Sequence, residues 1–143
     1  MLIGEYSHNI DQKGRVFIPA KFREELGQSF IVTRGIGTCL FVFSVEVWLE
    51  FAAKLGSVPV TDQKMQVFLR MLFASASECD TDKQGRILLP ARLREYAGMQ
   101  KEMVAIGVMS RVELWSAENW QEYNEHANDE YEATLEKLAE LGI

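Results

Sequence analysis

The chain has 143 residues, a hydrophobic content of 48% and a net charge of −6. Its apolar runs fall short of the roughly 18 residues that a membrane-spanning helix needs, so we exclude helical membrane spans and expect a soluble globular protein. The opening segment MLIGEYSH lacks a basic region followed by an apolar stretch. We therefore expect no secretory signal and a cytoplasmic location.

The negative charge is concentrated near the C-terminus. Residues 1–112 carry 14 basic and 12 acidic side chains, whereas residues 113–143 carry one lysine and nine acids. Charges separated by more than about 8 Å are largely screened at physiological ionic strength, so local charge matters more than the total. A nucleic-acid partner therefore remains compatible with the sequence, although the net charge alone argues against one.

One segment occurs twice along the chain. DQKGRVFIPAKFREELG at 11–27 returns as DKQGRILLPARLREYAG at 82–98 with eight of 17 positions identical, and SVEVWLEF at 44–51 matches SAENWQEY at 116–123. Such self-similarity predicts two copies of one folded module. Modules of about fifty residues are too small for comfortable independent cores, so we expect the two copies to share one.

The repeat sets the expected domain boundaries. The modules are placed at 5–47 and 76–119, with a helical linker at 56–75 and a C-terminal helix that reaches residue 143. The apolar face of the linker helix is broad for a lone surface helix, which predicts that it partly fills the joint core and partly meets another subunit in a homo-oligomer. Its stripe consists of Met65, Phe68, Leu69 and Leu72.

Each copy opens on a predicted tight turn. Asp11 and Asp82 stand first and Gly14 and Gly85 stand fourth, a spacing typical of a type I turn followed by a glycine with positive φ. Strand-forming segments precede and follow each turn, so the sequence predicts that each turn is the tip of a β-hairpin. The flanking strands are expected at 5–10, 16–18, 75–81 and 87–89.

Helices follow the turns in both copies, which makes the expected fold class α+β. Pro19 and Pro90 suit the first turn of a short helix, and Ser44 and Ser116 are candidate N-caps of longer ones. Apolar residues at helical spacing behind the two serines are expected to pack in the core. They are Trp48, Phe51, Ala52 and Leu55, and then Trp120, Tyr123, Ala127, Tyr131, Leu135 and Leu138.

Two basic loops result from the predicted turns. The first holds Lys13 and Arg15, and the second holds Lys83 and Arg86. Lysine and arginine neutralise DNA phosphates, and arginine also binds guanine O6 and N7 in a major groove wide enough for a two-stranded ribbon. The sequence therefore predicts two loops that bind double-stranded DNA.

An alternative gives the same charges a structural role. Asp11 can pair with Arg15, and Asp82 with Arg86, and each pair would then stabilise its turn without a ligand. Four further cations lie on the short helices, where they either contact the DNA backbone or remain solvated. They are Lys21, Arg23, Arg92 and Arg94.

The sequence has no catalytic or metal-binding motif. It contains no G-x-x-x-x-G-K-[ST] loop, no G-x-S-x-G motif and no H-E-x-x-H pair. Cys39 and Cys79 belong to no C-x-x-C pair, so we expect buried thiols rather than a disulfide or a zinc site. The sequence predicts a protein that is not an enzyme and has no cofactor, metal or small-molecule substrate.

The duplicated motif resembles a known family. The D-x-x-x-R signature at 11–15 and 82–86, the VFIP and ILLP segments behind it and the stretch SECDTDKQGR together resemble MraZ, a family of bacterial regulators with two tandem SpoVT-AbrB-type domains. The resemblance implies two pseudo-symmetric split β-barrel modules with flanking helices, assembled into a ring of subunits. It assigns DNA contacts to Lys13, Arg15, Lys83 and Arg86.

The resemblance also implies a cellular role. A member of this family would be a nucleoid-associated transcription factor that binds short repeated sites in the promoter of the division and cell-wall gene cluster containing its own gene. One difference between the copies bears on this role, because Lys13 lies two residues before its arginine and Lys83 lies three before. The two loops are therefore not expected to contribute equally.

Two other functions are compatible with these patterns. An antitoxin-like member of the wider fold would bind DNA and hold a protein partner with its C-terminal segment. Such tails are usually disordered alone, whereas the apolar stripe from Trp120 to Leu138 favours a packed helix. A structural oligomer without a DNA role would use the turns only as connectors, and binding to promoter DNA at physiological salt would exclude it.

Overall fold

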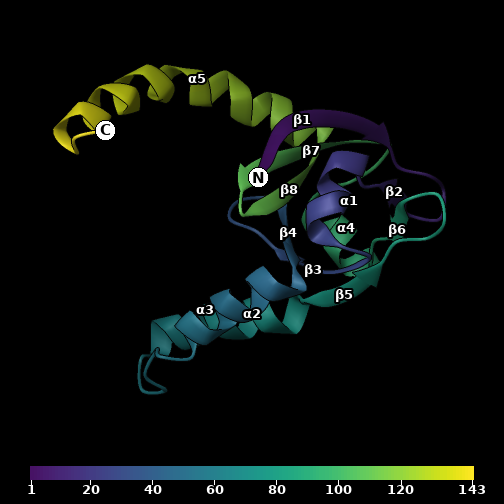
Figure 1. Ribbon diagram of the computed structural model, residues 1–143, viewed down its shortest axis with the longest axis horizontal. Coiled ribbons are helices and arrows are strands. Elements are labelled where there is room, and N and C mark those ends of the chain that lie inside the picture. The colour runs from purple at the N-terminus through teal and green to yellow at the C-terminus, as the bar shows by residue number, and fades with distance from the viewer.

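The computed structural model describes residues 1–143 and shows an α+β protein, as the sequence predicts (Figure 1). Eight strands and five helices make up the fold. In chain order they are β1 (Leu2–Asn9), β2 (Arg15–Phe17), α1 (Ala20–Leu26), β3 (Ser29–Arg34), β4 (Leu40–Ser44), α2 (Val45–Leu55), α3 (Gln63–Ser75), β5 (Ser77–Asp80), β6 (Arg86–Leu88), α4 (Ala91–Tyr96), β7 (Glu102–Met109), β8 (Arg111–Ser116) and α5 (Ala117–Glu140).

Strands from the two halves of the chain are interleaved in one antiparallel sheet. Six strands lie in the order β1-β7-β8-β4-β3-β5. Strand β1 of the first half therefore pairs with β7 of the second, and β3 of the first pairs with β5 of the second. The β1–β7 pair is the longest, from Leu2 opposite Met109 to Asn9 opposite Glu102. Each half is thus completed by strands of the other.

The prediction of a β-hairpin at each turn was wrong. Strands β1 and β2 flank the first turn but lie in different sheets, and β5 and β6 flank the second turn in the same way. Strand β2 pairs instead with β6 in a two-stranded antiparallel ribbon. This pairing buries Val16 and Ile87 in a core common to both halves, whereas separate hairpins would leave each apolar strand to a smaller core.

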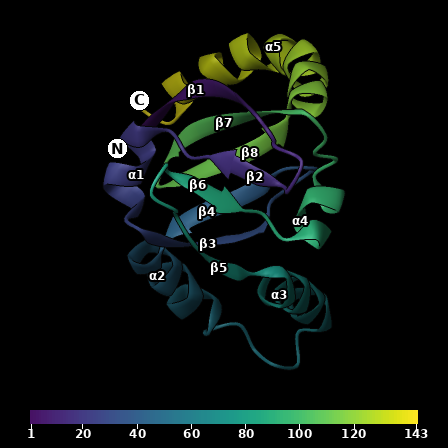
Figure 2. The same ribbon diagram turned by 90° about the vertical axis from the view of Figure 1, so that its right-hand side faces the viewer.

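The β2–β6 ribbon is symmetric about its central pair, Val16 opposite Ile87. The flanking pairs are Arg15 with Leu88 and Phe17 with Arg86. Because each strand begins at the end of a turn and the strands are antiparallel, the two turns lie at opposite ends of the ribbon. Figure 2 shows the ribbon in front of the sheet, between α1 and α4, with α5 above and α2 and α3 below.

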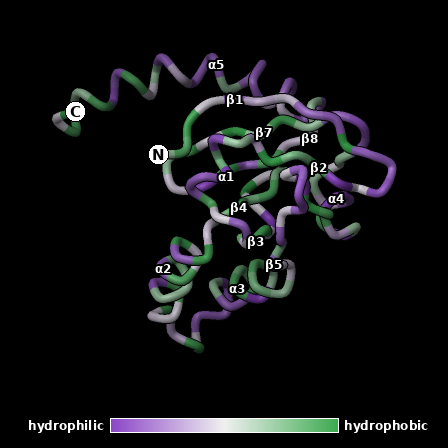
Figure 3. The backbone as a smooth tube through the Cα atoms, turned by 45° about the vertical axis from the view of Figure 1, so that its right-hand side comes forward, coloured by the Kyte–Doolittle hydropathy of each residue, from purple (hydrophilic) through white to green (hydrophobic).

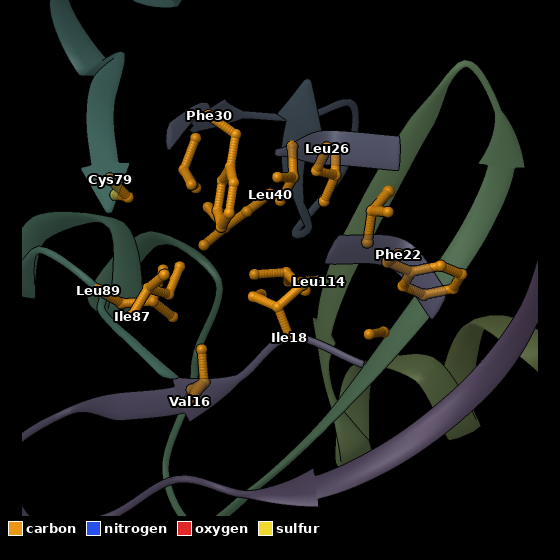
Figure 4. Close-up of a cluster of buried hydrophobic side chains, with 14 of the residues drawn as sticks. Val16, Ile18, Phe22, Leu26, Phe30, Leu40, Cys79, Ile87, Leu89 and Leu114 are labelled. Atoms are coloured by element: carbon orange, nitrogen blue, oxygen red, sulfur yellow. The ribbon is translucent and has the colours of Figure 1, made fainter. Parts of the chain in front are cut away.

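The two halves share one hydrophobic core behind the ribbon (Figure 4). Its cluster of 18 buried residues includes Val16 and Ile18 from the first half and Ile87 and Leu89 from the second, each 1% exposed or less. Burying a side chain of this size contributes about 1.5–3 kcal/mol. The common core expected from the small size of the modules is confirmed.

A second, smaller cluster lies under α2 and the start of α5. It consists of Cys39, Phe41, Phe43 and Trp115, with Val47, Trp48, Phe51, Ile106 and Trp120 packed against it. Ser44 and Ser116 cap the two helices as predicted, because their hydroxyl groups accept hydrogen bonds from the N–H groups of Val47 at 3.2 Å and Asn119 at 3.1 Å. The stripe of α2 thus packs in part, through its two aromatic residues.

Half of the apolar stripe of α5 is exposed and none of it is buried, so the prediction that it packs in the core was wrong. More than half of the side-chain surface of Tyr123, Tyr131 and Leu135 is accessible. Beyond its first turns, α5 leaves the body of the molecule, and no other element of the chain faces it (Figure 1). Helical spacing of apolar residues predicts an apolar face but not the surface that covers it.

Helix α3 shows a divided apolar face. Leu72 is buried, whereas Val67, Phe68 and Met71 are exposed. Figure 3 shows apolar segments on α3 and α5 outside the main body. Leu72 is buried but belongs to neither hydrophobic cluster, and the rest of the face is uncovered in the single chain. None of the five helices combines the length and apolar character that crossing a membrane requires.

The two cysteines are buried and unpaired, as the sequence predicts. Desolvation by the surrounding apolar side chains raises the pKa of Cys39 to about 12 and that of Cys79 to about 11. Both thiols therefore remain protonated at neutral pH. They pack as small apolar residues of the two clusters.

Candidate nucleic-acid interface

The first turn is closed around Asp11. The Asp11 N–H donates to the carbonyl of Arg15 at 3.1 Å, and the Gly14 N–H donates to the carbonyl of Asp11 at 3.0 Å. Asp11 Oδ1 accepts hydrogen bonds from the N–H groups of Lys13 (2.9 Å) and Arg15 (2.8 Å), and Oδ2 accepts one from Arg15 Nε at 2.6 Å. Gly14 has a backbone φ of 85°, a value that residues with a Cβ rarely adopt.

The second turn repeats these hydrogen bonds. Asp82 Oδ1 accepts from the N–H groups of Gln84 and Arg86, both at 2.9 Å, and Oδ2 accepts from Arg86 Nε at 2.9 Å. The Gly85 N–H donates to the carbonyl of Asp82 at 3.0 Å, and Gly85 has a φ of 80°. The same three residue types, aspartate, glycine and arginine, therefore fix the same loop in each half.

The guanidinium of each arginine is held through only one of its three nitrogen atoms. Arg15 and Arg86 bind their aspartates with Nε, and their terminal Nη groups donate to no protein acceptor. The ion pairs considered as a structural alternative are therefore present. They do not use the edge of the guanidinium formed by its two Nη groups, which stays free for a partner that offers two acceptor atoms, such as a phosphate or a base edge.

Both aspartates remain ionised well below neutral pH. The backbone N–H of Arg15 is the main cause that lowers the pKa of Asp11 below its usual range, and the guanidinium of the same residue adds to the effect. Arg86 lowers the pKa of Asp82 in the same two ways. Hydrogen bonds to the charged carboxylate favour that form, so the arginines stay oriented throughout the neutral range.

Each turn also contacts an arginine of the opposite half. The Arg94 guanidinium lies against Gly14, and the Arg23 guanidinium lies against Gly85, so closely that a methyl group on either glycine would collide with it. Nε of each arginine donates to a backbone carbonyl of its own half, at 3.0 Å for Arg23 and 3.1 Å for Arg94. Three cations thus meet at each turn, two from one half and one from the other.

The remaining two predicted cations do not share this position. Lys21 is exposed at the start of α1. Arg92 lines a pocket of about 280 Å³ between α3 and α4, together with Arg34 and Tyr96. The structure therefore separates the four helix cations into a pair at the turns, Arg23 and Arg94, and a pair elsewhere on the short helices.

Few carboxylates neutralise the cations of the turns and short helices. The chain has four salt bridges, of which two lie within the turns. No carboxylate lies within ion-pair distance of Lys13, Lys83, Arg23 or Arg94. The ribbon face is consequently basic, while most of the acidic side chains of the C-terminal segment lie on α5. Positive charge is thus concentrated at the turns and short helices and negative charge on α5, and the net charge of −6 is only their sum.

The sequence of both halves matches one protein family. The sequence model of the family described as "MraZ protein, putative antitoxin-like" matches residues 1–71 and again residues 72–141. The chain belongs to the MraZ family. The resemblance seen in the duplicated D-x-x-x-R motif is confirmed, and MraZ domains account for both copies of the repeat.

Relatives within the MraZ family match along the full length. The chain is 50% identical over 143 residues to the transcriptional regulator MraZ of Moorella thermoacetica and 52% identical over 143 residues to that of Caldicellulosiruptor saccharolyticus, with 100% of each chain covered. It is 53% identical over 141 residues to the transcriptional regulator MraZ of Carboxydothermus hydrogenoformans, with 99% of both covered. This similarity assigns the chain to the transcriptional regulators and is consistent with its not being an enzyme.

The sequence prediction missed the contact between the halves at this MraZ-family site. A signal for it exists, since identical glycine and arginine residues recur nine positions apart in each copy. These residues are Gly14 and Arg23, and then Gly85 and Arg94. Spacing alone would have paired each arginine with the glycine of its own copy. The β2–β6 pairing reverses this, because it brings each turn beside the opposite short helix.

Proposed function

We propose that this MraZ-family chain is a sequence-specific DNA-binding transcriptional regulator that contacts duplex DNA with its two D-x-x-x-R turns. The observation that carries the proposal is that the guanidinium groups of Arg15 and Arg86 bind aspartate through Nε alone, which leaves both Nη groups free at the ends of the ribbon. A guanidinium presented in this way donates two hydrogen bonds to guanine O6 and N7. Such a contact discriminates against the wrong base by about 1–3 kcal/mol.

The other cations are assigned to the DNA backbone. Lys13, Lys83, Arg23 and Arg94 have no carboxylate partner and lie at the turns, so they suit phosphates on either side of the bases that the two arginines reach. Lys21 and Arg92 are assigned weaker, outlying backbone contacts. Asp11, Gly14, Asp82 and Gly85 shape the turns and do not touch DNA. Phosphate contacts fix register and supply most of the salt dependence, whereas base contacts supply specificity.

The target is inferred from the family resemblance. We propose the promoter of the division and cell-wall gene cluster that contains the chain's own gene, bound at short repeated sites by a cytoplasmic, nucleoid-associated protein. Repeated sites suit an assembly that presents many identical turns, because linked weak contacts gain from a high effective concentration.

The assembly itself is proposed to be a ring of identical chains. Each chain would contribute two modules, 5–47 and 76–119, of the split β-barrel type. The proposal is supported by the exposed apolar faces of α3 and α5, which are larger than scattered surface residues require. Light scattering of the purified chain tests it, and a monomeric mass at micromolar concentration would contradict it.

The exposed stripe of α5 also favours a second candidate, an antitoxin-like protein that holds a different protein with this helix. The two candidates predict different effects of mutations that disrupt the apolar stripe of α5. Tyr131→Glu with Leu135→Glu should break up the homo-oligomer if α5 meets another copy of the chain. If α5 serves a different protein, the same variant should keep the mass of the unmodified chain and lose only that partner.

A footprinting experiment tests the DNA-binding proposal. The full chain is mixed with DNA from upstream of its own gene, and the protected duplex is then titrated by fluorescence anisotropy beside a scrambled duplex of equal composition. We expect protection of repeated sites, tighter binding to the protected duplex, and an affinity that falls with salt at a slope of about 0.9 per phosphate contact. Equal affinity for both duplexes, or no binding at physiological salt, would contradict the proposal.

A further inference from the structure

The outward face of the β2–β6 ribbon carries two large apolar side chains, one beside each of its arginines. Successive side chains of a strand point to opposite faces. Val16 and Ile87 face the core and are buried, whereas Phe17 is 41% exposed and Leu88 is 60% exposed. Neither Phe17 nor Leu88 belongs to either hydrophobic cluster of the fold. Core packing therefore does not account for them.

The register places each of these apolar residues directly opposite an arginine. Leu88 pairs with Arg15, and Phe17 pairs with Arg86. Residues directly opposite in an antiparallel pair have their Cβ atoms about 4.5–5.5 Å apart. Each arginine that we assign to a base therefore has an apolar neighbour on the same face, supplied by the other half of the chain. Figure 2 shows this short ribbon with its broad face unobstructed by any helix.

The chemistry of the duplex narrows what such a pair can contact. Phosphates are charged, and the base edges of guanine, cytosine and adenine in the major groove offer hydrogen-bond donors and acceptors. The C5 methyl group of thymine is the apolar feature of that surface, and apolar side chains contact it in protein–DNA complexes. A basic ribbon that carries Phe17 at one end and Leu88 at the other, each beside an arginine, is complementary to a groove in which thymine lies beside guanine.

We propose that Phe17 and Leu88 are specificity-determining residues that bind thymine methyl groups next to the bases reached by Arg86 and Arg15. This inference rests on the proposed function, since it assumes that the ribbon enters the major groove. Each end of the ribbon then carries one composite reader, which is a pair of side chains that contacts adjacent bases. The pair consists of an arginine of one half and an apolar residue of the other. A base step with a thymine next to a guanine is the expected preference at each end.

The two readers are not equivalent. Phe17 is the larger residue, and its ring packs against that of His8 with centroids 5.7 Å apart, whereas Leu88 is more exposed. Phe17 is therefore the better fixed of the two and has less side-chain freedom to lose on binding. We expect the thymine contacted by Phe17 to contribute more to affinity than the thymine contacted by Leu88.

Replacing thymine by uracil removes only the methyl group and tests the proposal directly. Each thymine of the footprinted duplex is replaced in turn, and affinity for the full-length protein is measured by fluorescence anisotropy. Burying one methyl group corresponds to roughly fourfold in affinity. We expect one or a few positions at which uracil weakens binding of the unmodified protein by about that factor, and no effect at the other positions.

Variants then connect those positions to the ribbon. Phe17→Ala should abolish the uracil effect at one set of positions and Leu88→Gln at another, while Phe17→Leu should retain it because the side chain stays apolar. Val60→Ala is the control, since Val60 is exposed outside the ribbon and the change should leave every uracil effect in place. Circular dichroism and light scattering check that each variant folds and keeps its assembly. If Phe17→Ala does not fold, Phe17→Leu and Leu88→Gln still decide the outcome.

The outcomes separate this inference from the function on which it rests. Specific, salt-dependent binding without a uracil effect at any position would overturn the methyl contact and leave DNA binding intact. A uracil effect that persists unchanged in Leu88→Gln and Phe17→Ala would also overturn it. Failure of the unmodified protein to prefer the footprinted duplex over the scrambled one would overturn both.

Discussion

The turns at 11–15 and 82–86 make the same hydrogen bonds from different sequences. The first reads DQKGR and the second DKQGR, so glutamine and lysine have exchanged places between fixed aspartate, glycine and arginine positions. The two middle residues of each turn are exposed, and only the second of them, Lys13 or Gln84, contributes a backbone N–H group to the aspartate. Any residue type supplies those groups. The comparison teaches that geometry fixes three positions, whereas the lysine needs only to carry charge near the turn.

The largest expected effect follows from removing the arginines. Arg15→Ala and Arg86→Ala should each weaken operator binding by roughly 5-fold to 150-fold, because each loses a two-pronged contact to a base. We expect Arg86→Ala to have the smaller or a similar effect, and the double variant to lose specific binding. Anisotropy titrations measure affinity, and thermal denaturation should show little change.

Arg70→Ala is the matched control for these variants, since Arg70 is an exposed arginine on α3, outside both turns and the ribbon. It should leave the affinity near that of the unmodified protein. Unchanged affinity in both arginine variants of the turns would contradict the assignment of these turns as the DNA-binding site.

The next effect concerns stability and tests the contact between halves. Gly14→Ala places a side chain at positive φ, at a cost of about 1–2 kcal/mol, and drives a methyl group into the Arg94 guanidinium. We expect a lower Tm. Adding Arg94→Ala should recover part of the loss, whereas adding Arg23→Ala should recover none. Equal recovery of Tm by Arg94→Ala and by Arg23→Ala would contradict the contact between each turn and the arginine of the opposite half.

A subtler change affects the aspartates. Asp11→Asn keeps an oxygen for the backbone N–H groups but removes the charge that holds Arg15 Nε, and Asp82→Asn does the same to Arg86. A negative charge near DNA phosphates is also lost. We therefore expect weaker binding to the operator and stronger binding to a scrambled duplex, so that the ratio of the two affinities falls. A ratio that stays constant in both variants would argue against an orienting role.

The smallest effect on DNA binding is expected from the lysine. Lys13→Gln removes one phosphate contact and should lower the slope of log affinity against log salt by about 0.9. Gln12→Lys combined with Lys13→Gln converts the first turn into the sequence of the second and should restore the slope. A slope that remains low in the double variant would mean that the position of Lys13 matters, and not only its charge.

Acid titration should leave the two turns unchanged until low pH. The folded-state pKa of Asp11 and that of Asp82 are lowered, so their contribution to stability is present above the usual aspartate range and is lost only as the pH falls through the lower folded values. Carbon-13 NMR of the carboxyl carbons should give both midpoints below that range. A normal midpoint at one turn would show that its aspartate is not held as in the other.

Local features of the site could be predicted from the sequence, and features that join distant residues could not. Asp11 and Arg15 are four residues apart, so the turn and its ion pair follow from their types and spacing. The partner of β2 is different, because an apolar three-residue strand suits a hairpin with β1 as well as a ribbon with β6. Only the core common to both halves decides between them.

The C-terminal helix illustrates the same limit. The spacing from Trp120 to Leu138 predicts an amphipathic helix, and α5 is one. Whether that face packs depends on the surface that lies opposite it. Within one chain, no surface lies opposite the part of α5 beyond Tyr123. The family match, in contrast, was predictable, because the duplicated motif is a property of the sequence alone.

The interleaving of the strands makes each chain equivalent to a dimer whose two halves share one polypeptide. The first half expressed alone would lack the partners of β1 and β2 and one of the two partners of β3, and would need a second copy of itself to complete the sheet, at the cost of a dependence on concentration. Covalent joining removes that dependence. It also allows each half to acquire its own substitutions, as the exchange of glutamine and lysine in the turns and of phenylalanine and leucine on the ribbon shows. Two identical subunits related by twofold symmetry present the same side chains to both half-sites, which suits a palindrome, whereas a joined pair is free to read an asymmetric sequence.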